Sequence, residues 1–261
     1  MKLITSRDNA LYKELKHLAT SAQARRKAAT TLLDGVHLCQ AYLDMVGQPV
    51  WCVVNEAAQR HPEIAQLIQR TEHQLVLADA LYQSLSQVEH GVGIFFVAQI
   101  PQADTPTQIL ESAVVLENLQ DPGNLGSVLR SAAAAGIRKV FCSPQTVSAW
   151  SPKVLRAGMG AHFLMEIHEQ ADLLTLLKNS QLPTLATSSY ATKTIYECDL
   201  SEGVIWLFGH EGQGLSDELM GCATTQVKIP HRGNIESLNV AACAAVCFFE
   251  QVRQGLTDSG A

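Results

Sequence analysis

The chain has 261 residues, of which 47% are hydrophobic and 17% are charged. This composition excludes an intrinsically disordered chain, and no apolar run reaches the roughly 20 residues that a membrane-spanning helix needs. The length allows one large or two smaller domains. The formal net charge of −6 argues against a general affinity for nucleic acid.

The first 27 residues, which read as a helical region, differ from the rest of the chain in charge. They hold seven Lys and Arg side chains but only two Asp and Glu. Two interpretations stay open: this end attracts a polyanion, or it is the solvated face of an amphipathic helix. The basic residues are Lys2, Arg7, Lys13, Lys16, Arg25, Arg26 and Lys27.

Beyond residue 27, short apolar strands alternate with helices, which indicates an α/β fold with a mainly parallel sheet. A stretch with two prolines and no apolar periodicity, 99–108, interrupts the alternation. We therefore predict two domains, 1–100 and 111–261, with a linker over 101–110. The predicted strands are 30–33, 50–54, 74–77 and 93–98, then 114–119, 139–142, 163–167, 184–187, 204–208 and 226–229. The predicted helices are 36–45, 62–70 and 80–86, then 125–135, 153–156, 172–179, 217–220 and 239–253.

An arrangement of strand, polar loop and helix occurs three times in the second domain. The first runs from Val114 to Gly136. Asn124 lies where a helix N-cap is expected, and Gly136 lies where a C′ glycine is expected. Arg130 projects from the flank of the predicted helix, in its second turn. Because open α/β sheets bind ligands where their strands end, Arg130 could act on a ligand at this turn.

The second arrangement, 204–216, carries a glycine-rich loop. Gly209, Gly212 and Gly214 let the backbone approach a ligand closely and offer it N–H groups. Their spacing matches neither the dinucleotide fingerprint nor a Walker A motif, so the ligand stays open. Glu211 in this loop is either a solvated turn residue or an anchor for a neighbouring donor, and its residue type alone favours the solvated position.

The third arrangement, 227–240, leads into a nearly all-apolar helix that Ser237 can cap. Asn239 lies in the first turns of this helix, and leaving a buried amide unpaired costs about 1–3 kcal/mol. Asn239 therefore either ties its own loop together or orders a ligand pocket. The glycines and small polar residues of the loops favour the pocket.

The cysteines suggest no metal site. Seven occur without a Cys-x-x-Cys pair, and no signal peptide is visible after Met1. Cys243 and Cys247 share a helix face, but Ala and Val surround them. We expect them to be core residues of a protein in a reducing cytoplasm.

Together, the three arrangements resemble the motifs of the SpoU (TrmH-type) RNA 2′-O-methyltransferases of the SPOUT class, over about residues 112–255. Residues 153–161 resemble the connecting segment of that family. The basic N-terminal domain, with the run 33–37, resembles the ribosomal-protein-like RNA-binding domain of many members. Two positions depart from the family pattern: Asp34, where Glu is usual, and Ala241, where Ser is frequent.

The resemblance implies transfer of a methyl group from S-adenosylmethionine to a ribose 2′-hydroxyl of RNA. It also implies a deep trefoil knot in the catalytic domain, a homodimer, and RNA binding by the N-terminal domain. The implied catalytic residues are Arg130, Asn124, Glu211, Ser237 and Asn239. The implied cofactor-binding residues are Thr187, Ser188, Gly209, Gly214, Ile229 and Leu238. The RNA-binding residues are expected to be Arg25, Arg26 and Lys27, with Lys153 and Arg156 continuing their track.

The role of Arg130 stays open between a base and a cation. In the family, the matching arginine is held to activate the hydroxyl. Deprotonating a guanidinium at neutral pH costs about 7 kcal/mol, so stabilising the developing alkoxide as a cation costs less. The other four catalytic candidates would then position Arg130 and the ribose.

The two-domain plan favours ribosomal RNA over transfer RNA as substrate, and no membrane association is expected. One alternative is a methyltransferase for transfer RNA. Another is a non-catalytic RNA-binding or assembly protein on the same fold, against which the complete set of five catalytic candidates argues. A small-nucleotide enzyme is disfavoured, because the glycine loop lacks a following Lys-Ser/Thr and no acidic metal cluster occurs.

Overall fold

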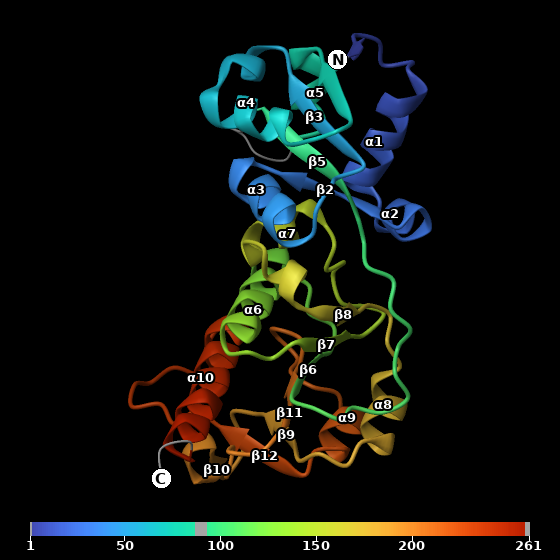
Figure 1. Cartoon of the computed structure of the whole chain (residues 1–261). Coiled ribbons are helices and arrows are strands. Elements are labelled where there is room, and N and C mark those ends of the chain that lie inside the picture. Colours follow the sequence, from blue (N-terminus) through green and yellow to red (C-terminus); the bar gives the residue numbers. More distant parts are fainter. Residues whose placement is uncertain (1, 87–92, 259–261) are drawn as a thin grey trace. The chain divides into compact units, whose positions relative to one another are not determined.

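The computed structural model describes residues 2–86 and 93–258, which form two compact units (Figure 1). One unit comprises the chain up to Gln102 together with Trp150–Phe163, and the other comprises Ala103–Ala149 and the chain from Leu164 onward. The sequence placed the segment Trp150–Phe163 in the second domain. It instead packs with the first unit, where the Thr31 hydroxyl donates to the Trp150 carbonyl at 2.7 Å.

The first unit is a five-stranded sheet with helices around it. Its strand order is β1-β4-β3-β5-β2, and β5 runs antiparallel to both of its neighbours, whereas the other pairs are parallel. The strands are β1 (Lys2–Ile4), β2 (Thr30–Asp34), β3 (Trp51–Asn55), β4 (Gln74–Leu77) and β5 (Ile94–Gln99). The helices are α1 (Ala10–Thr20), α2 (Ala22–Ala28), α3 (Val36–Met45), α4 (Pro62–Gln69), α5 (Asp79–Gln83) and α7 (Pro152–Gly158), with a 3₁₀ turn at Ala57–Arg60.

The second unit is built on a seven-stranded sheet in which every pair is parallel, with the order β10-β12-β9-β11-β6-β7-β8. The predicted α/β class with a mainly parallel sheet is therefore confirmed. The strands are β6 (Ala113–Leu116), β7 (Lys139–Cys142), β8 (Glu166–His168), β9 (Thr184–Thr187), β10 (Lys193–Thr194), β11 (Ile205–Phe208) and β12 (Thr225–Lys228). The helices are α6 (Pro122–Ala134), α8 (Leu173–Asn179), α9 (Asp217–Gly221) and α10 (Val240–Asp258).

Several predicted elements differ from the structure. The N-terminal region is not wholly helical, because Lys2–Ile4 pairs with β4 as β1. The strand predicted at 163–167 begins later, at Glu166, because Ala161–Leu164 form a 3₁₀ turn. The short strand β10 was not predicted at all.

Helix α10 is fixed to the sheet by its polar side chains. Trp206 of β11 is fully buried, and its indole Nε1 donates to Gln251 Oε1 at 2.8 Å. Gln251 Nε2 in turn donates to the hydroxyl of Ser112 at 3.0 Å, and Leu200 N donates to Gln254 Oε1 at 2.8 Å. Helix α10 also packs against α6 (Figure 1). Among the described residues, no helix combines the length and apolarity needed to cross a membrane.

Candidate functional site

The three motif loops meet because their strands end at one edge of the parallel sheet. The strands β12, β9, β11 and β6 are consecutive neighbours. Their register pairs Phe208 with Leu116 and Val227 with Thr187, so these four strands end at nearly the same level. The loops that follow β6, β11 and β12 therefore emerge together, with the end of β9 between them.

The turn after β6 is shaped by the N-terminus of α6. Asp121, and not Asn124 as predicted, is the N-cap, and its carboxylate accepts from Asn124 N at 2.8 Å. Pro122 at the first helical position has no N–H to satisfy, which starts the helix earlier than expected. The side chain of Asn124 is thereby left available for contacts outside its own helix. Gly136 has the predicted left-handed conformation, with φ of +80°.

Glu211 anchors this turn from the neighbouring loop. Its Oε1 accepts from Asp121 N and from Asn124 Nδ2, each at 3.1 Å, and its Oε2 accepts from Gln120 N at 3.2 Å. Partial burial raises the pKa of this carboxyl, but the hydrogen bonds from Asn124 and the backbone outweigh burial and lower the pKa from its ordinary value. The structure thus resolves the choice left open by the sequence in favour of an anchor.

Asn239 joins the third loop to the other two. Its Nδ2 donates to Asn124 Oδ1 at 2.9 Å, and its Oδ1 accepts from Ala241 N at 2.9 Å and from Ala242 N at 3.3 Å. Asn239 therefore caps α10, a role that the sequence assigned to Ser237. Ser237 is exposed in the preceding loop. Asn239 thus ties its own loop together and also bonds Asn124 of the first motif loop, while its part in a ligand pocket stays a prediction.

Arg130 lies on the exposed face of α6, near this network in sequence but not held by it. Within residues 2–86 and 93–258, no hydrogen bond or ion pair fixes its guanidinium. The same exposed face carries small residues one turn to either side, Ser127 and Ala134. Arg130 is therefore a charged side chain on an otherwise small and weakly polar helix surface.

The glycine loop is closed on itself, which corrects one expectation. His210 N donates to Gly214 O at 3.0 Å and Gly214 N donates to His210 O at 2.8 Å. His210 Nδ1 accepts from Gly212 N at 2.9 Å and from Gln213 N at 3.2 Å. The amides of Gly212, Gln213 and Gly214 are thus engaged with His210 and do not point to a ligand. A Cβ at Gly209 would overlap the backbone of Gly214, so only glycine permits this closure.

The loop 229–239 is open by contrast. Between His231 and Leu238, only Ile235 N donates to another backbone group, the Gly233 carbonyl at 3.0 Å, as far as the described part of the chain shows. Ile235 and Leu238 are both exposed on this loop. Backbone donors that bond no other backbone group, beside exposed apolar side chains, are suited to a flat heteroaromatic ligand.

The remaining cofactor candidates lie along this edge. Thr187 ends β9, half-buried, and its hydroxyl donates to Leu207 O at 3.2 Å. Ser188 follows it, and its N–H donates to Val227 O at 2.9 Å. Ile229 directly follows β12. The edge therefore brings Thr187, Ser188, Gly209, Ile229 and Leu238 to one end of the sheet.

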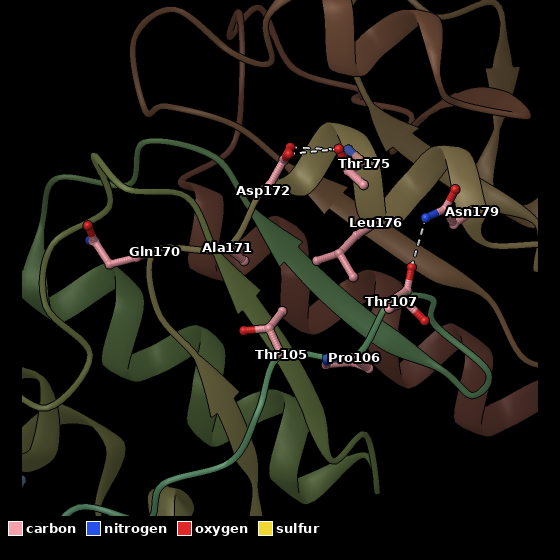
Figure 2. Close-up of a pocket in the computed structure, with 9 residues that line it drawn as sticks. All are labelled: Thr105, Pro106, Thr107, Gln170, Ala171, Asp172, Thr175, Leu176 and Asn179. Carbon is pink, nitrogen blue, oxygen red and sulfur yellow. Dashed lines mark hydrogen bonds between the residues drawn. The ribbon is translucent and has the colours of Figure 1, made fainter.

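A pocket of about 320 Å³ elsewhere in this unit belongs to different segments (Figure 2). It lies between residues 105–107 and the start of α8, where Thr175 Oγ1 donates to Asp172 Oδ2 at 2.7 Å and Asn179 Nδ2 donates to Thr107 O at 3.0 Å. None of its lining residues belongs to the three motif loops. Because it is separate from these loops, we assign it no role in the site.

The basic candidates of the first unit separate into two kinds. Arg25 is only 4% exposed, and its Nη1 donates to the Leu18 carbonyl at 2.8 Å. The buried guanidinium of Arg25 therefore joins α2 to α1. The expectation that Arg25 contacts RNA phosphates is not met, because its side chain is buried. Arg26 and Lys27 are exposed. Lys153 and Arg156 lie on α7, in this unit and not in the second one.

Sequence reasoning missed three participants. The backbone amides of Gln120 and Asp121 bind Glu211, and Glu117 Oε2 accepts from Ser216 N at 2.7 Å. Backbone donors have no side-chain signature, which is why they could not be found. The Asp-Pro pair at 121–122 was the one available signal, because it marks a helix start.

The sequence profile of the SpoU rRNA Methylase family matches residues 111–249, which include all three motif loops. The chain belongs to the SpoU rRNA methylase family. An uncharacterized tRNA/rRNA methyltransferase of Synechocystis sp. is 33% identical to it over 257 residues, covering 96% of this chain and 93% of that protein.

Two further proteins, both named rRNA methyltransferases, resemble this chain over nearly its whole length. The 23S rRNA (guanosine(2553)-2′-O)-methyltransferase RlmP of Bacillus subtilis is 28% identical over 251 residues, covering 95% of this chain and 98% of that protein. The crystal structure of an AdoMet-bound rRNA methyltransferase from Sinorhizobium meliloti superimposes with a TM-score of 0.80 at 25% identity, covering 97% of each chain. The likeness to these two proteins thus spans both units of this chain, whereas the family profile covers residues 111–249.

We predict that Glu211→Gln loosens the turn after β6. A glutamine side chain keeps one acceptor oxygen and turns an NH₂ group toward at least one of the three donors, which loses its bond. Amide hydrogen exchange at Gln120 and Asp121 should accelerate about tenfold, the equivalent of one hydrogen bond. Glu218→Gln, at an exposed carboxylate of α9, is the control and should leave both rates unchanged. Unaltered exchange in Glu211→Gln would exclude the anchor role.

The same amides should report the ionisation of Glu211. Because its pKa is lowered in the folded protein, its contribution to stability is present above the ordinary glutamate pKa of about 4.3 and is lost as the pH falls through the lower folded value. Protection of Gln120 and Asp121, corrected for intrinsic exchange, should therefore persist at about pH 5 and decline only in more acidic solution. A decline already between about pH 7 and 5 would contradict this assignment.

Proposed function

We propose that this protein transfers a methyl group from S-adenosylmethionine to a ribose 2′-hydroxyl of ribosomal RNA. The observation that carries the proposal is the hydrogen-bond chain from Glu211 through Asn124 to Asn239, which joins all three motifs of a SpoU family member. The B. subtilis relative is named for this reaction on 23S rRNA, and the S. meliloti relative is named an rRNA methyltransferase.

The open loop after β12 fits S-adenosylmethionine. Backbone amides between His231 and Leu238 can bond the edge of an adenine, and Ile235 and Leu238 offer apolar contact for its faces. The backbone at Gly209 and Ile229 would complete this cradle, with Thr187 and Ser188 at its side. When bound, the cofactor supplies a methyl group made electrophilic by a sulfonium.

Gly214 takes a different part from the one implied by the resemblance. Both of its backbone groups bond His210, so it shapes the loop next to the cradle and leaves ligand contact to its neighbours.

A trefoil knot is part of the proposal. It is supported by the path of the chain, which passes from β9 out to β10, across to β11 on the other side of β9, and back to β12 between β9 and β10.

The protein must align the 2′-oxygen with the methyl group and stabilise the charge that develops on it. Alignment alone can contribute about 7–11 kcal/mol to lowering the barrier. Arg130 acts as a cation: its guanidinium donates hydrogen bonds to the 2′-oxygen while the hydroxyl proton passes to water. Asn124 and Asn239, fixed by Glu211, position the ribose, and the exposed Ser237 hydroxyl is placed on the same loop to contact it.

The first unit binds the RNA through phosphate contacts. Arg26 and Lys27 are exposed at the end of α2, and Lys13 and Lys16 are exposed on α1. Such contacts position the RNA without reading its sequence. Ribosomal RNA as substrate puts the enzyme in the cytoplasm, in line with the free thiols of all seven cysteines.

The enzyme acts as a homodimer formed through α10. This helix is apolar on two sides, since Ala244, Cys247 and Phe248 are buried in the core while Phe249 is 49% and Leu256 71% exposed. Phe249 and Leu256 are one heptad apart, so they share one face of the helix. A second copy covering this face would remove apolar surface from water and bring a neighbouring chain close to the exposed face of α6.

The proposed reaction is tested with methyl-labelled S-adenosylmethionine and unmodified ribosomal RNA, followed by mapping of 2′-O-methylated riboses. Label should enter RNA with the native protein, and Arg130→Ala should lower kcat at least about 100-fold while the cofactor dissociation constant stays within about twofold. Arg138→Ala removes an exposed cation at the opposite edge of the same sheet and serves as the control. Substantial turnover by Arg130→Ala would remove Arg130 from the chemistry, and absence of any labelling together with absence of cofactor binding would refute the function.

The phosphate contacts of the first unit are tested by the salt dependence of RNA binding. The double variant Arg26→Ala/Lys27→Ala should reduce the slope of log Kd against log salt by roughly 1.5, because two counterion-releasing contacts disappear. Arg70→Ala is the matched control, since Arg70 is exposed on the same unit but paired with Asp44 at 2.7 Å. An unchanged slope in the double variant would leave these residues as a solvated helix end.

The dimer is tested by Phe249→Glu, which places a charge on the apolar face of α10. Light scattering after size-exclusion chromatography should show the mass of two chains for the native protein and of one chain for Phe249→Glu. Leu110→Glu is the control, because Leu110 is 76% exposed and does not belong to α10. A native protein that elutes with the mass of one chain at micromolar concentration would contradict the proposal.

A further inference from the structure

Tyr190 stands out on the surface of the second unit. It is 94% exposed, more than any other large apolar side chain among the described residues. Leaving an aromatic ring almost fully in water contributes nothing to the stability of the fold. An aromatic side chain held in this position beside a ligand edge needs another explanation.

The backbone around Tyr190 is held firmly, so the exposure is not that of a loose loop. Ser188 Oγ accepts from Tyr190 N at 3.3 Å, and Ser188 O accepts from Ala191 N at 3.3 Å. Ser188 itself donates to Val227 O at 2.9 Å, and Ala191 is buried. The turn is thus fixed to β12 on one side and to the core on the other, and it directs Tyr190 outward.

Cations gather beside this turn. The pairing of β10 with β12 sets Lys193 opposite Val227 and Thr194 opposite Lys228. Arg232 follows four residues later in the open loop, within roughly 14 Å of chain. Lys193 and Arg232 are exposed, and Lys228 is half-buried.

The second unit as a whole is acidic, unlike this group of cations. The second unit contains sixteen Asp and Glu side chains but only eight Lys and Arg, of which three lie in these neighbouring segments. Two carboxylates accompany them. Glu197 is turned onto Thr194, whose N and Oγ1 both donate to its Oε2 at 2.7 Å, and Glu236 lies on the exposed loop. A polyanion approaching this unit therefore finds its most favourable surface here.

The position of the turn relates this surface to the proposed reaction. Ser188 follows β9, and β9 lies between β12 and β11, whose loops carry Asn239 and Glu211. The exposed tyrosine and the cations therefore border the edge at which the ribose would be methylated.

We propose that Tyr190, Lys193, Lys228 and Arg232 form a contact for single-stranded RNA next to the target nucleotide. The ring of Tyr190 stacks on an unpaired base that flanks the target, and the three cations contact the phosphates on either side of it. This inference rests on the proposed function, because it names how the same site holds its RNA. It adds a contact on the second unit to the phosphate contacts of the first.

Stacking explains why a tyrosine is exposed here without a partner in its own chain. Base–aromatic stacking accepts any base, so the contact grips the strand near the target without selecting its sequence. The flanking cations fix the strand through its phosphates, which keeps the neighbouring ribose from rotating away. A target in a loop or bulge, where bases are unstacked, suits this arrangement.

The contact is tested by binding of a fluorescein-labelled single-stranded RNA 12-mer to the full-length protein, followed by anisotropy. All variants carry Arg26→Ala/Lys27→Ala as a common background, which reduces binding by the first unit. Tyr190→Ala should weaken binding about 5- to 100-fold, whereas Tyr190→Phe, which keeps the ring, should stay within about twofold of the background. Lys193→Ala/Arg232→Ala should weaken binding and flatten its salt dependence.

Several results would overturn the inference. Equal RNA affinity for Tyr190→Ala and the background would exclude stacking, and a loss in Tyr190→Phe as large as in Tyr190→Ala would assign the effect to the hydroxyl. Unchanged RNA affinity combined with a halved mass in light scattering would make this surface a protein interface. The dissociation constant of S-adenosylmethionine, measured by calorimetry, should be unchanged in Tyr190→Ala and Tyr190→Phe.

The binding assay separates this inference from the proposed function, because it needs no turnover. If the native protein methylates no RNA but Tyr190→Ala still loses single-strand binding, the contact stands and the reaction fails. If the native protein methylates ribosomal RNA, Tyr190→Ala should raise the KM for RNA more than it lowers kcat. A normal KM and kcat in Tyr190→Ala would leave the reaction intact and refute the contact.

Discussion

The carboxylate of Glu211 is the interaction on which the rest of the site depends. It accepts three hydrogen bonds from the turn after β6, one of them from Asn124, which is 87 residues away in the chain. Because Asn124 then accepts from Asn239, a further 115 residues along, one ionised group organises three loops. Hydrogen bonds to a charged acceptor are stronger than those between neutral groups, so a carboxylate suits this position better than an amide would.

The loop 209–214, which carries Glu211, and the loop 229–239 have different roles. His210 closes the loop 209–214 through hydrogen bonds with Gly212, Gln213 and Gly214, and this closure supports Glu211. The loop 229–239 leaves its amides available, which gives a ligand something to bind. A closed support beside an open binding loop keeps reacting groups aligned without the cost of ordering them during the reaction.

Local patterns predicted the strands well and the contacts poorly. Apolar runs located 74–77, 139–142 and 184–187 at their observed bounds, because buried parallel strands are continuous apolar segments. The edge strands β1 and β10 have no such run, and Arg25 looked like a surface cation because its residue type usually is one. Asp121 and Asn124 can both cap a helix. Pro122 favours the first helical position, and this makes Asp121 the N-cap. The pairing of Asn124 with Asn239 has no local signal, and it was the family resemblance that brought the two residues together.

The double role of Asn239 has a consequence for how the protein is made. The side chain that caps α10 is also the one that closes the hydrogen-bond chain, so docking of the last helix and assembly of the site are a single event. During synthesis the strands β6 to β12 leave the ribosome before α10 does. The nascent chain therefore cannot acquire an ordered site until α10 has emerged, and a chain that stops before α10 would carry strands β6 to β12 but no completed network.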